Sequence, residues 1–415
     1  MPILALWVIW KKQELGIVYL PFFFFLNDMI DRNLPAMVNY FTVSMMVGYY
    51  LFHNLTFVKR NIFSLLLVIH FFILLPNAKD LVRIRPDFFA SIVLFLLIPI
   101  IAEVYTKFPR ERIFEELSKS SLFIMIFFII NTVFSTVLRY NPTEMYGITS
   151  GVLYGNIYLS DFNILAFASF IVIRKGIKDK SIIHIAVYIA TIFLVLLSFR
   201  RTAMGLALLG TVIVMIELLN FKQIKQFIMY GFVLAVVSLV IVYSTGFLAV
   251  FQERYELRKL DDRALGEEKR LMELDLMYKD LFVYYDYSPW TGYELFDYKG
   301  SNYGKGIFGE ERPLHSDYAV LIHSSGLIGL SLYLLMMFVA ITSIWRRTNT
   351  KDDYLQFMFC MIAFCVFFIT GRFSKISFMV MMFMIWYLPI ARKTKVVSKI
   401  SGSLRNTKRA LSLKS

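Results

Sequence analysis

The stretch HIAVYIATIFLVLLSFRRTAMGLALLGTVIVMIELL, residues 184–219, contains two apolar runs that meet at a pair of arginines. Each run approaches the length needed to cross the hydrocarbon core of a bilayer, about 17 to 25 residues. Because that core holds no water to hydrate a polar backbone, such runs must fold as helices. The stretch therefore predicts a helical hairpin in a membrane, with Arg200 and Arg201 at its turn.

Similar apolar runs recur along most of the chain. Its 415 residues are 58% hydrophobic and only 18% charged, which is too much apolar surface for a soluble protein to bury. The mean hydropathy is +0.62. We expect an all-α, polytopic membrane protein of about twelve spans. They centre on residues 15–30, 36–53, 62–76, 88–105, 120–139, 155–173, 182–198, 202–219, 227–247, 317–344, 354–371 and 374–391.

Basic residues in the connections predict which side each one faces. The basic tail is expected in the cytoplasm, and an even number of spans then places the N-terminus there too, beside Lys11 and Lys12. The short connections assigned to the cytoplasm contain fifteen Lys and Arg residues, whereas those assigned to the opposite side contain nine. This difference favours the assignment and accounts for the formal net charge of +14 without invoking a nucleic acid partner.

The spans divide the chain into four predicted parts. An N-terminal bundle of about nine helices covers residues 1–247, and a large extracytoplasmic loop covers 248–316. C-terminal membrane helices follow over 317–391, and the basic cytoplasmic tail covers 392–415. The loop is rich in aromatic residues, with LFVYYDYSPWTGYELFDYKGSNYGKG at 281–306. Tyr287, Trp290 and Tyr293 are candidates for stacking on sugar rings, and packing of this segment against the membrane face is the alternative.

Four cations lie in short turns on the predicted outer side, against the general trend of the charges. Arg200 and Arg201 form one pair, and Arg372 and Lys375 lie in TGRFSKIS, residues 370–377. Guanidinium groups bind phosphate oxygens in a bidentate manner, and a helix that begins at such a turn adds its free N–H groups. We therefore expect a site for a phosphate or pyrophosphate. Ordinary loop charges that anchor the helices at the interface are the alternative.

The stretch RPLHSDYAVLIHSSGLIGLSLYLL, residues 312–335, returns the chain to the membrane after the loop. His315 precedes the predicted helix and is a candidate general base, because imidazole titrates near neutral pH. His323 is expected to pack inside the helix. Gly326 and Gly329 form a small-residue stretch that would permit close approach of helices.

Three motifs in this order resemble the bacterial O-antigen polymerase/O-antigen ligase family. SFRRTAMGLALLG is similar to the family's S-x-S-R-x-A motif. RLMELDLMYKDLFVYYDYSPWTGYE, residues 270–294, resembles its loop arginine followed by P-x-x-G-x-G, and residues 312–335 resemble its H-N-x-x-L return. The resemblance covers about residues 185–345. The chain departs from the pattern at Ser316, where the family has Asn, and at Glu294, where it has the second Gly.

The resemblance implies a GT-C-like glycosyltransferase of the membrane and carries roles over to matching residues. Arg200 or Arg201 matches the first family arginine, and the pair leaves the register open by one residue. Arg270 matches the loop arginine, with a solvated loop charge as the alternative assignment, and His315 matches the proposed base. Three further loop arginines are alternatives to Arg270, namely Arg254, Arg258 and Arg263. The chemistry expected is an inverting transfer without metal or other cofactor.

The predicted function is a polymerase for O-antigen, capsule or exopolysaccharide in the bacterial plasma membrane. It would transfer an undecaprenyl-pyrophosphate-linked glycan onto a lipid-linked repeat unit at the outer face. The donor and acceptor lipids and the surrounding membrane lipids are the expected partners, with a flippase and a chain-length regulator as further candidates. Two other functions stay open: a ligase that passes the glycan to lipid A-core or another terminal acceptor, and a flippase or transporter of lipid-linked oligosaccharide.

Overall fold

The protein is a bundle of helices in a computed structural model that describes residues 1–30, 35–138, 162–198, 200–218, 269–285, 287–296, 314, 316–371 and 373–392. Within these ranges the only pairings of strand type are two isolated bridges. The first half contains α1 (Pro2–Lys12), η1 (Gln13–Tyr19), α2 (Leu20–Ile30), α3 (Ala36–His53), η2 (Leu55–Lys59), α4 (Ile62–Leu74), η3 (Leu75–Asn77), α5 (Leu81–Lys107) and α6 (Arg110–Val137). The second half contains α8 (Phe162–Lys178), α9 (Ile182–Leu197), α10 (Arg201–Glu217), α13 (Lys269–Phe282), α15 (Asp317–Trp345), α16 (Lys351–Thr370), α17 (Ile376–Trp386) and η5 (Leu388–Ile390).

Four of the described helices are long and apolar enough to cross a membrane: α5, α6, α15 and α16. Three shorter apolar segments, Ile62–Asn77, Ile182–Leu196 and Ile376–Ile390, run beside them. The predicted all-helical fold is confirmed for the described ranges, and the apolar helices identify an integral membrane protein. The total of about twelve spans stays a prediction, and so do the boundaries of the four parts.

The helices coincide with the predicted apolar runs except at a few boundaries. The segment predicted as a first span at 15–30 instead starts as the 3-10 helix η1, and α2 begins only at Leu20. Before it, α1 ends at Lys12, and its C-cap residue Gln13 has a φ of 52°, which turns the chain. Helices α5 and α6 begin at Leu81 and Arg110, upstream of the apolar runs. The first turn of α6 is polar, and the early turns of α5 contain the charged residues Arg83, Arg85 and Asp87. The predicted span 227–247 and the basic tail from residue 393 fall in ranges that the structure does not describe.

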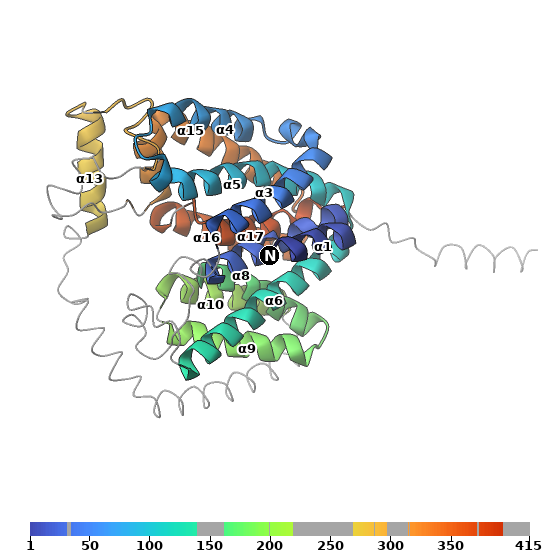
Figure 1. Cartoon of the computed structure of the whole chain (residues 1–415). Helices are drawn as coiled ribbons and strands as arrows, with labels where there is room; N and C mark the ends of the chain where they lie inside the picture. The colour runs from blue at the N-terminus through green and yellow to red at the C-terminus, as the bar shows by residue number, and fades with distance from the viewer. Residues whose placement is uncertain are drawn as a thin grey trace, which may run out of the picture.

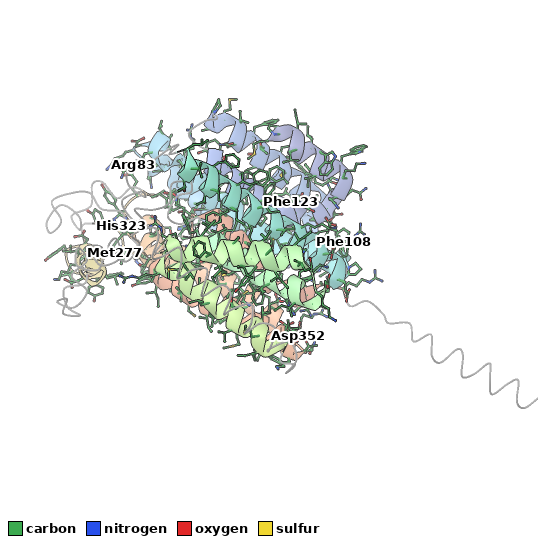
Figure 2. The ribbon with its side chains drawn as sticks, turned by 90° about the horizontal axis from the view of Figure 1, so that it is seen from below. Arg83, Phe108, Phe123, Met277, His323 and Asp352 are labelled. Carbon is green, nitrogen blue, oxygen red and sulfur yellow. The ribbon has the colours of Figure 1, made fainter. Side chains whose placement is uncertain are left out.

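The bundle helices run alongside one another, so that the bundle has two ends (Figure 1). Figure 2 places Arg83, Met277 and His323 at one of them, and Phe108 and Asp352 at the other. We call the first the loop end, because the described loop residues 287–296 lie there, bonded to α15. The second is the ion-pair end. In the predicted topology the loop end faces outward and the ion-pair end faces the cytoplasm.

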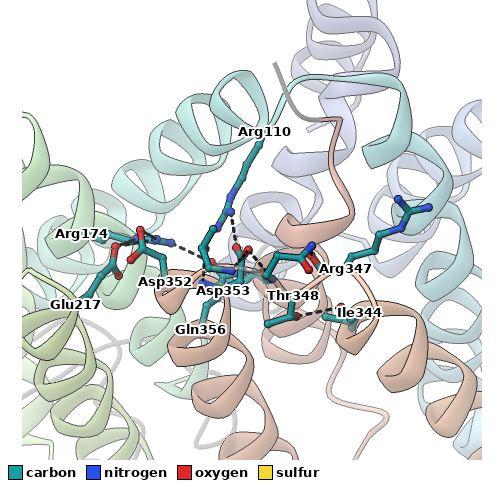
Figure 3. A network of polar contacts seen from close by, with 12 residues as sticks. Arg110, Arg174, Glu217, Ile344, Arg347, Thr348, Asp352, Asp353 and Gln356 are labelled. Atoms are coloured by element: carbon teal, nitrogen blue, oxygen red, sulfur yellow. Dashed lines mark hydrogen bonds and ion pairs between the residues drawn. The ribbon is translucent and has the colours of Figure 1, made fainter. Parts of the chain in front are cut away.

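Ion pairs tie several helices together at the ion-pair end (Figure 3). Arg110 of α6 pairs with the buried carboxylate of Asp353, which also takes part in the capping box that starts α16. Arg174 of α8 contacts Glu217 of α10 at 2.8 Å and donates to Gln356 of α16 at 2.9 Å. These contacts fix the relative positions of α6, α8, α10 and α16.

Aromatic rings fill the interior between α4, α5 and α15. Phe95 stacks on Phe373 with ring centroids 5.6 Å apart, and Phe71 meets Phe95 edge to face at 5.4 Å. Pro99 has no N–H to donate to the carbonyl of Phe95 within α5, and the hydroxyl of Ser64 donates to that carbonyl instead. The carbonyl that Pro99 leaves without a helical donor is therefore satisfied inside the bundle.

Candidate active site at the loop end

Helix α15 is interrupted near its start by a glycine in a conformation that a helix does not allow. Gly326 has φ 65° and ψ −167°, so the hydrogen-bond ladder breaks there. The loop supplies the missing partners. The carbonyl of His323 accepts from the N–H of Tyr293 at 2.7 Å, and the N–H of Leu327 donates to Pro289 at 2.8 Å. Because buried backbone groups must be paired, the break and the loop segment are complementary.

The loop segment at the break is a tight turn formed by Ser288–Pro289–Trp290–Thr291–Gly292. The N–H of Gly292 donates back to the carbonyl of Ser288 at 2.8 Å, with Gly292 at φ 76°. A Cβ at Gly292 would lie 2.5 Å from the carbonyl oxygen of His323, and a Cβ at Gly326 would overlap the backbone of Trp290. Both glycines are required, because the two backbones approach more closely than side chains permit.

Two apolar residues after the turn anchor the loop in the bundle. Leu295 and Phe296 are almost fully buried, and the Phe296 ring lies 5.8 Å from Phe71 and 6.1 Å from Phe373. The N–H of Phe296 donates to the hydroxyl of Ser324 at 3.2 Å, within the broken part of α15. This part of the loop is thus built into the fold.

The aromatic residues predicted to bind sugar take two different environments. The rings of Tyr287 and Tyr293 meet edge to face at 4.3 Å, and both approach the buried His323, at 6.2 Å and 5.4 Å. His323 packs inside the structure as predicted. Trp290 is 63% exposed at the turn. Of the three candidates, Trp290 therefore offers the most open ring for stacking on a ligand.

Lys79 and Glu294 add a charged edge to the tyrosine pair. Glu294 is buried, accepts from the backbone N–H of Lys79, and lies 3.8 Å from the Lys79 ammonium. That ammonium also lies 5.5 Å from the centre of the Tyr293 ring, within cation–π range. The connection before α5 is therefore fastened to the loop, a contact that sequence reasoning missed. Glu294 stands where the family pattern has glycine, and this departure was the one feature of the sequence that could have pointed to the contact.

Helix α13 lies across the loop end, transverse to the bundle helices (Figure 1). It buries Met277 and Leu281 and leaves Tyr278 exposed, and it packs on α15. On its solvent side Lys279 contacts Asp275 at 2.6 Å, and this hydrogen bond raises the pKa of Lys279. Arg270 is the second residue of α13, so its backbone is at the loop end, but its side chain is not among those described.

Three of the predicted cations lie at starts of helices that begin at the loop end. Arg200 is the N-cap residue of α10, is half-buried, and places its guanidinium 5.5 Å from the Phe162 ring centre. Arg201 is the exposed first residue of the same helix, and Lys375 is the half-buried N-cap of α17. The N-terminal ends of these two helices carry partial positive charge, which adds to the positive potential of the cations beside them. Arg372 and His315 lie outside the described ranges.

The region that holds these elements is similar to a known protein family. Residues 186–334 match a family model described as O-antigen ligase. The resemblance predicted from three sequence motifs is thereby confirmed over this region. No curated protein matches the chain. The match supports an O-antigen ligase-like or polymerase-like membrane enzyme that acts on lipid-linked oligosaccharide.

The O-antigen ligase match begins inside α9 and ends within α15, so it includes both arginines of the helical hairpin, α13, the docked turn and the break at Gly326. Within it, the structure brings together the P-x-x-G turn at 289–292 and the break at Gly326. Motifs about 35 residues apart in the chain are thus joined by backbone hydrogen bonds. Contacts of His315 and of the Arg270 side chain with this assembly lie beyond the described part of the chain.

Proposed function

We propose that the protein is a polysaccharide polymerase of the bacterial plasma membrane. It transfers a growing glycan from undecaprenyl pyrophosphate onto the next lipid-linked repeat unit at the loop end, which faces outward. The observation that carries the proposal is the docking of the 289–292 turn into the break at Gly326, inside the region similar to O-antigen ligases. A loop held by these backbone hydrogen bonds can position groups for chemistry next to the membrane surface.

The cations at the loop end supply the electrostatic part of the proposed reaction. A pyrophosphate leaving group gains negative charge as its bond to the anomeric carbon breaks. Arg200 and Arg201, at the start of α10, are proposed to hold the pyrophosphate together with Arg372 and Lys375. Arg270 is proposed to stabilise the departing phosphate oxygen. Guanidinium groups can stabilise this negative charge, so the proposed reaction requires no metal or other cofactor.

His315 is proposed to accept the proton of the attacking sugar hydroxyl. The hydroxyl oxygen forms a bond to the anomeric carbon while the bond to the pyrophosphate oxygen breaks, and direct displacement inverts the anomeric centre. Trp290, with Tyr287 and Tyr293 behind it, is proposed to support the sugar ring of the acceptor. The neighbours of His315 in the sequence, Leu314 and Ser316, are both buried.

The family description favours one alternative, a ligase that passes the finished glycan to a terminal acceptor such as lipid A-core. Glycan analysis of a strain lacking the gene separates the two. Loss of a polymerase leaves products with a single repeat unit, whereas loss of a ligase leaves long lipid-linked chains. Accumulation of such long chains in the deletion strain contradicts the polymerase proposal and supports the ligase.

A further inference from the structure

A cavity of about 220 Å³ lies at the ion-pair end, remote from the docked turn. It is bounded by the start of α4, the last turns of α5, the end of α15 and η5. Its walls combine three arginines, Arg60, Arg346 and Arg347, with apolar surface from residues such as Pro99 and Ala102. A cavity lined by both basic and apolar side chains suits an amphipathic anion.

Two of the three arginines carry a charge that no described carboxylate neutralises. Arg60 donates to Glu103 at 2.5 Å, so its charge is largely neutralised. Arg346 and Arg347 are exposed, and neither forms an ion pair among the described side chains. Figure 3 shows Arg347 directed away from the Asp353 carboxylate, which Arg110 already occupies. The cavity therefore carries an excess of about two positive charges.

A buried amide provides a second, independent feature. Asn61 lines the cavity, is 4% exposed, and donates through Nδ2 to the carbonyl of Met336 at 2.8 Å. Its Oδ1 is buried and has no hydrogen-bond partner among the described residues. Leaving a buried acceptor unpaired costs about 1 to 3 kcal/mol. A ligand hydroxyl in the cavity would satisfy it.

We propose that this cavity binds the headgroup of an anionic phospholipid that carries both a phosphate and a hydroxyl, of the phosphatidylglycerol type. Arg346 and Arg347 contact the phosphate, Asn61 Oδ1 accepts from the headgroup hydroxyl, and the apolar wall meets the glycerol and the first methylenes. Basic pockets between membrane helices are suited to such headgroups. In the proposed topology the lipid comes from the cytoplasmic leaflet. Free phosphate shares the charge but has no apolar part to bury.

The test uses the full-length protein in nanodiscs and counts bound lipid by native mass spectrometry. We expect the wild type to retain phosphatidylglycerol in preference to phosphatidylcholine, and to show a higher Tm in phosphatidylglycerol. Inorganic phosphate added to phosphatidylcholine nanodiscs should not reproduce this rise in Tm. Equal retention of the two lipids by the wild type overturns the proposal without any variant, and an equal effect of phosphate assigns the site to a free anion instead.

Variants then locate the lipid. Arg346→Gln with Arg347→Gln should lower the affinity for phosphatidylglycerol about thirtyfold, the effect of two guanidinium groups near a phosphate. Ser343→Phe keeps every charge and should block the lipid by filling the cavity. Lys178→Gln with Lys180→Gln removes two exposed charges at the same end and should leave retention unchanged. Undiminished retention by the arginine variant, or an equal loss in the lysine control, contradicts a site in this cavity.

Discussion

The backbone N–H of Tyr293 donates to the carbonyl of His323 at 2.7 Å, although 30 residues separate them in the chain. The bond exists because Gly326 ends the first turns of α15 and leaves that carbonyl without a helical partner. The loop at Gly292 can come near enough only because neither glycine has a side chain. The active site that we propose depends on this joint between loop and helix.

Gly326→Ala should therefore displace the loop. The alanine Cβ would overlap the backbone of Trp290, and φ 65° is unfavourable for an L-residue, at a cost of about 1 to 3 kcal/mol. We expect a lower Tm, faster proteolysis between α13 and α15, and loss of transfer activity. Gly48→Ala is the matched control, since nothing lies within 4 Å of a Cβ there. A Gly326→Ala protein with normal polymer output means that the docked turn is not needed for transfer.

Arg200→Ala and Arg201→Ala, singly and together, should weaken stabilisation of the negative charge that develops on the pyrophosphate. Removal of one group that stabilises developing charge typically lowers kcat by about 100-fold or more, so we expect a loss of that order in the single variant that matters. Polymer amount and length on gels, with accumulation of the lipid-linked donor, report the effect. The double variant Arg83→Ala with Arg85→Ala is the control: it removes two positive charges at the same end and should leave polymer output unchanged. Unchanged polymer in the Arg200, Arg201 double variant removes the anion site from the mechanism.

His315→Ala should abolish transfer while the lipid-linked donor accumulates, because the acceptor hydroxyl then lacks a base. The variant protein should keep its Tm, since the proposed role of His315 is chemical. His323→Ala is the informative comparison. His323 is buried beside Tyr287 and Tyr293, so its loss should lower the Tm as well as the activity. Full activity of the His315→Ala protein rules out this residue as the base.

The sequence predicted the helices well because each one is a nearly continuous apolar run. The run predicted at 36–53 is α3 at both boundaries, and the run at 317–344 differs from α15 by one residue. Boundaries failed where polar first turns extend a helix beyond its apolar part, as at Arg110 of α6. They also failed at η1, where 3-10 geometry replaces the first five residues of the expected span, 15–19, although these residues are apolar.

The site was only partly predictable. Residue types identified Gly326, Gly329 and the P-x-x-G turn as special positions, but hydropathy carries no information about which backbone groups pair. The contacts of Glu294 with Lys79 and of His323 with the tyrosines join segments from three parts of the chain. The ion pair between Arg110 and Asp353 could not be predicted either, because both residues read from sequence as ordinary charges in cytoplasmic connections.

Arg110→Ala should destabilise the protein, because it leaves the carboxylate of Asp353 buried at 2% exposure without its cation. Breaking a buried ion pair costs about 3 to 5 kcal/mol, and the 27% exposure of Arg110 places the expected cost near the lower value. Arg112→Ala, at an exposed position in the same turn, is the matched control. Thermal unfolding in detergent measures both. Arg110→Ala combined with Asp353→Asn should recover part of the loss, and an equally unstable double variant means that the pair is not the cause.

Labelling of single cysteines tests which end of the bundle faces outward. Asn302 lies in the predicted extracytoplasmic loop, whereas Lys351 starts α16 at the ion-pair end, next to the Arg110–Asp353 pair. In a background with Cys360 and Cys365 replaced, Asn302→Cys should react with a membrane-impermeant maleimide on intact spheroplasts. Lys351→Cys should react only after the membrane is opened. The reverse pattern would place the arginines of α10 and the docked turn in the cytoplasm, away from glycans presented on the outer leaflet, and the polymerase proposal would then fail on topology alone.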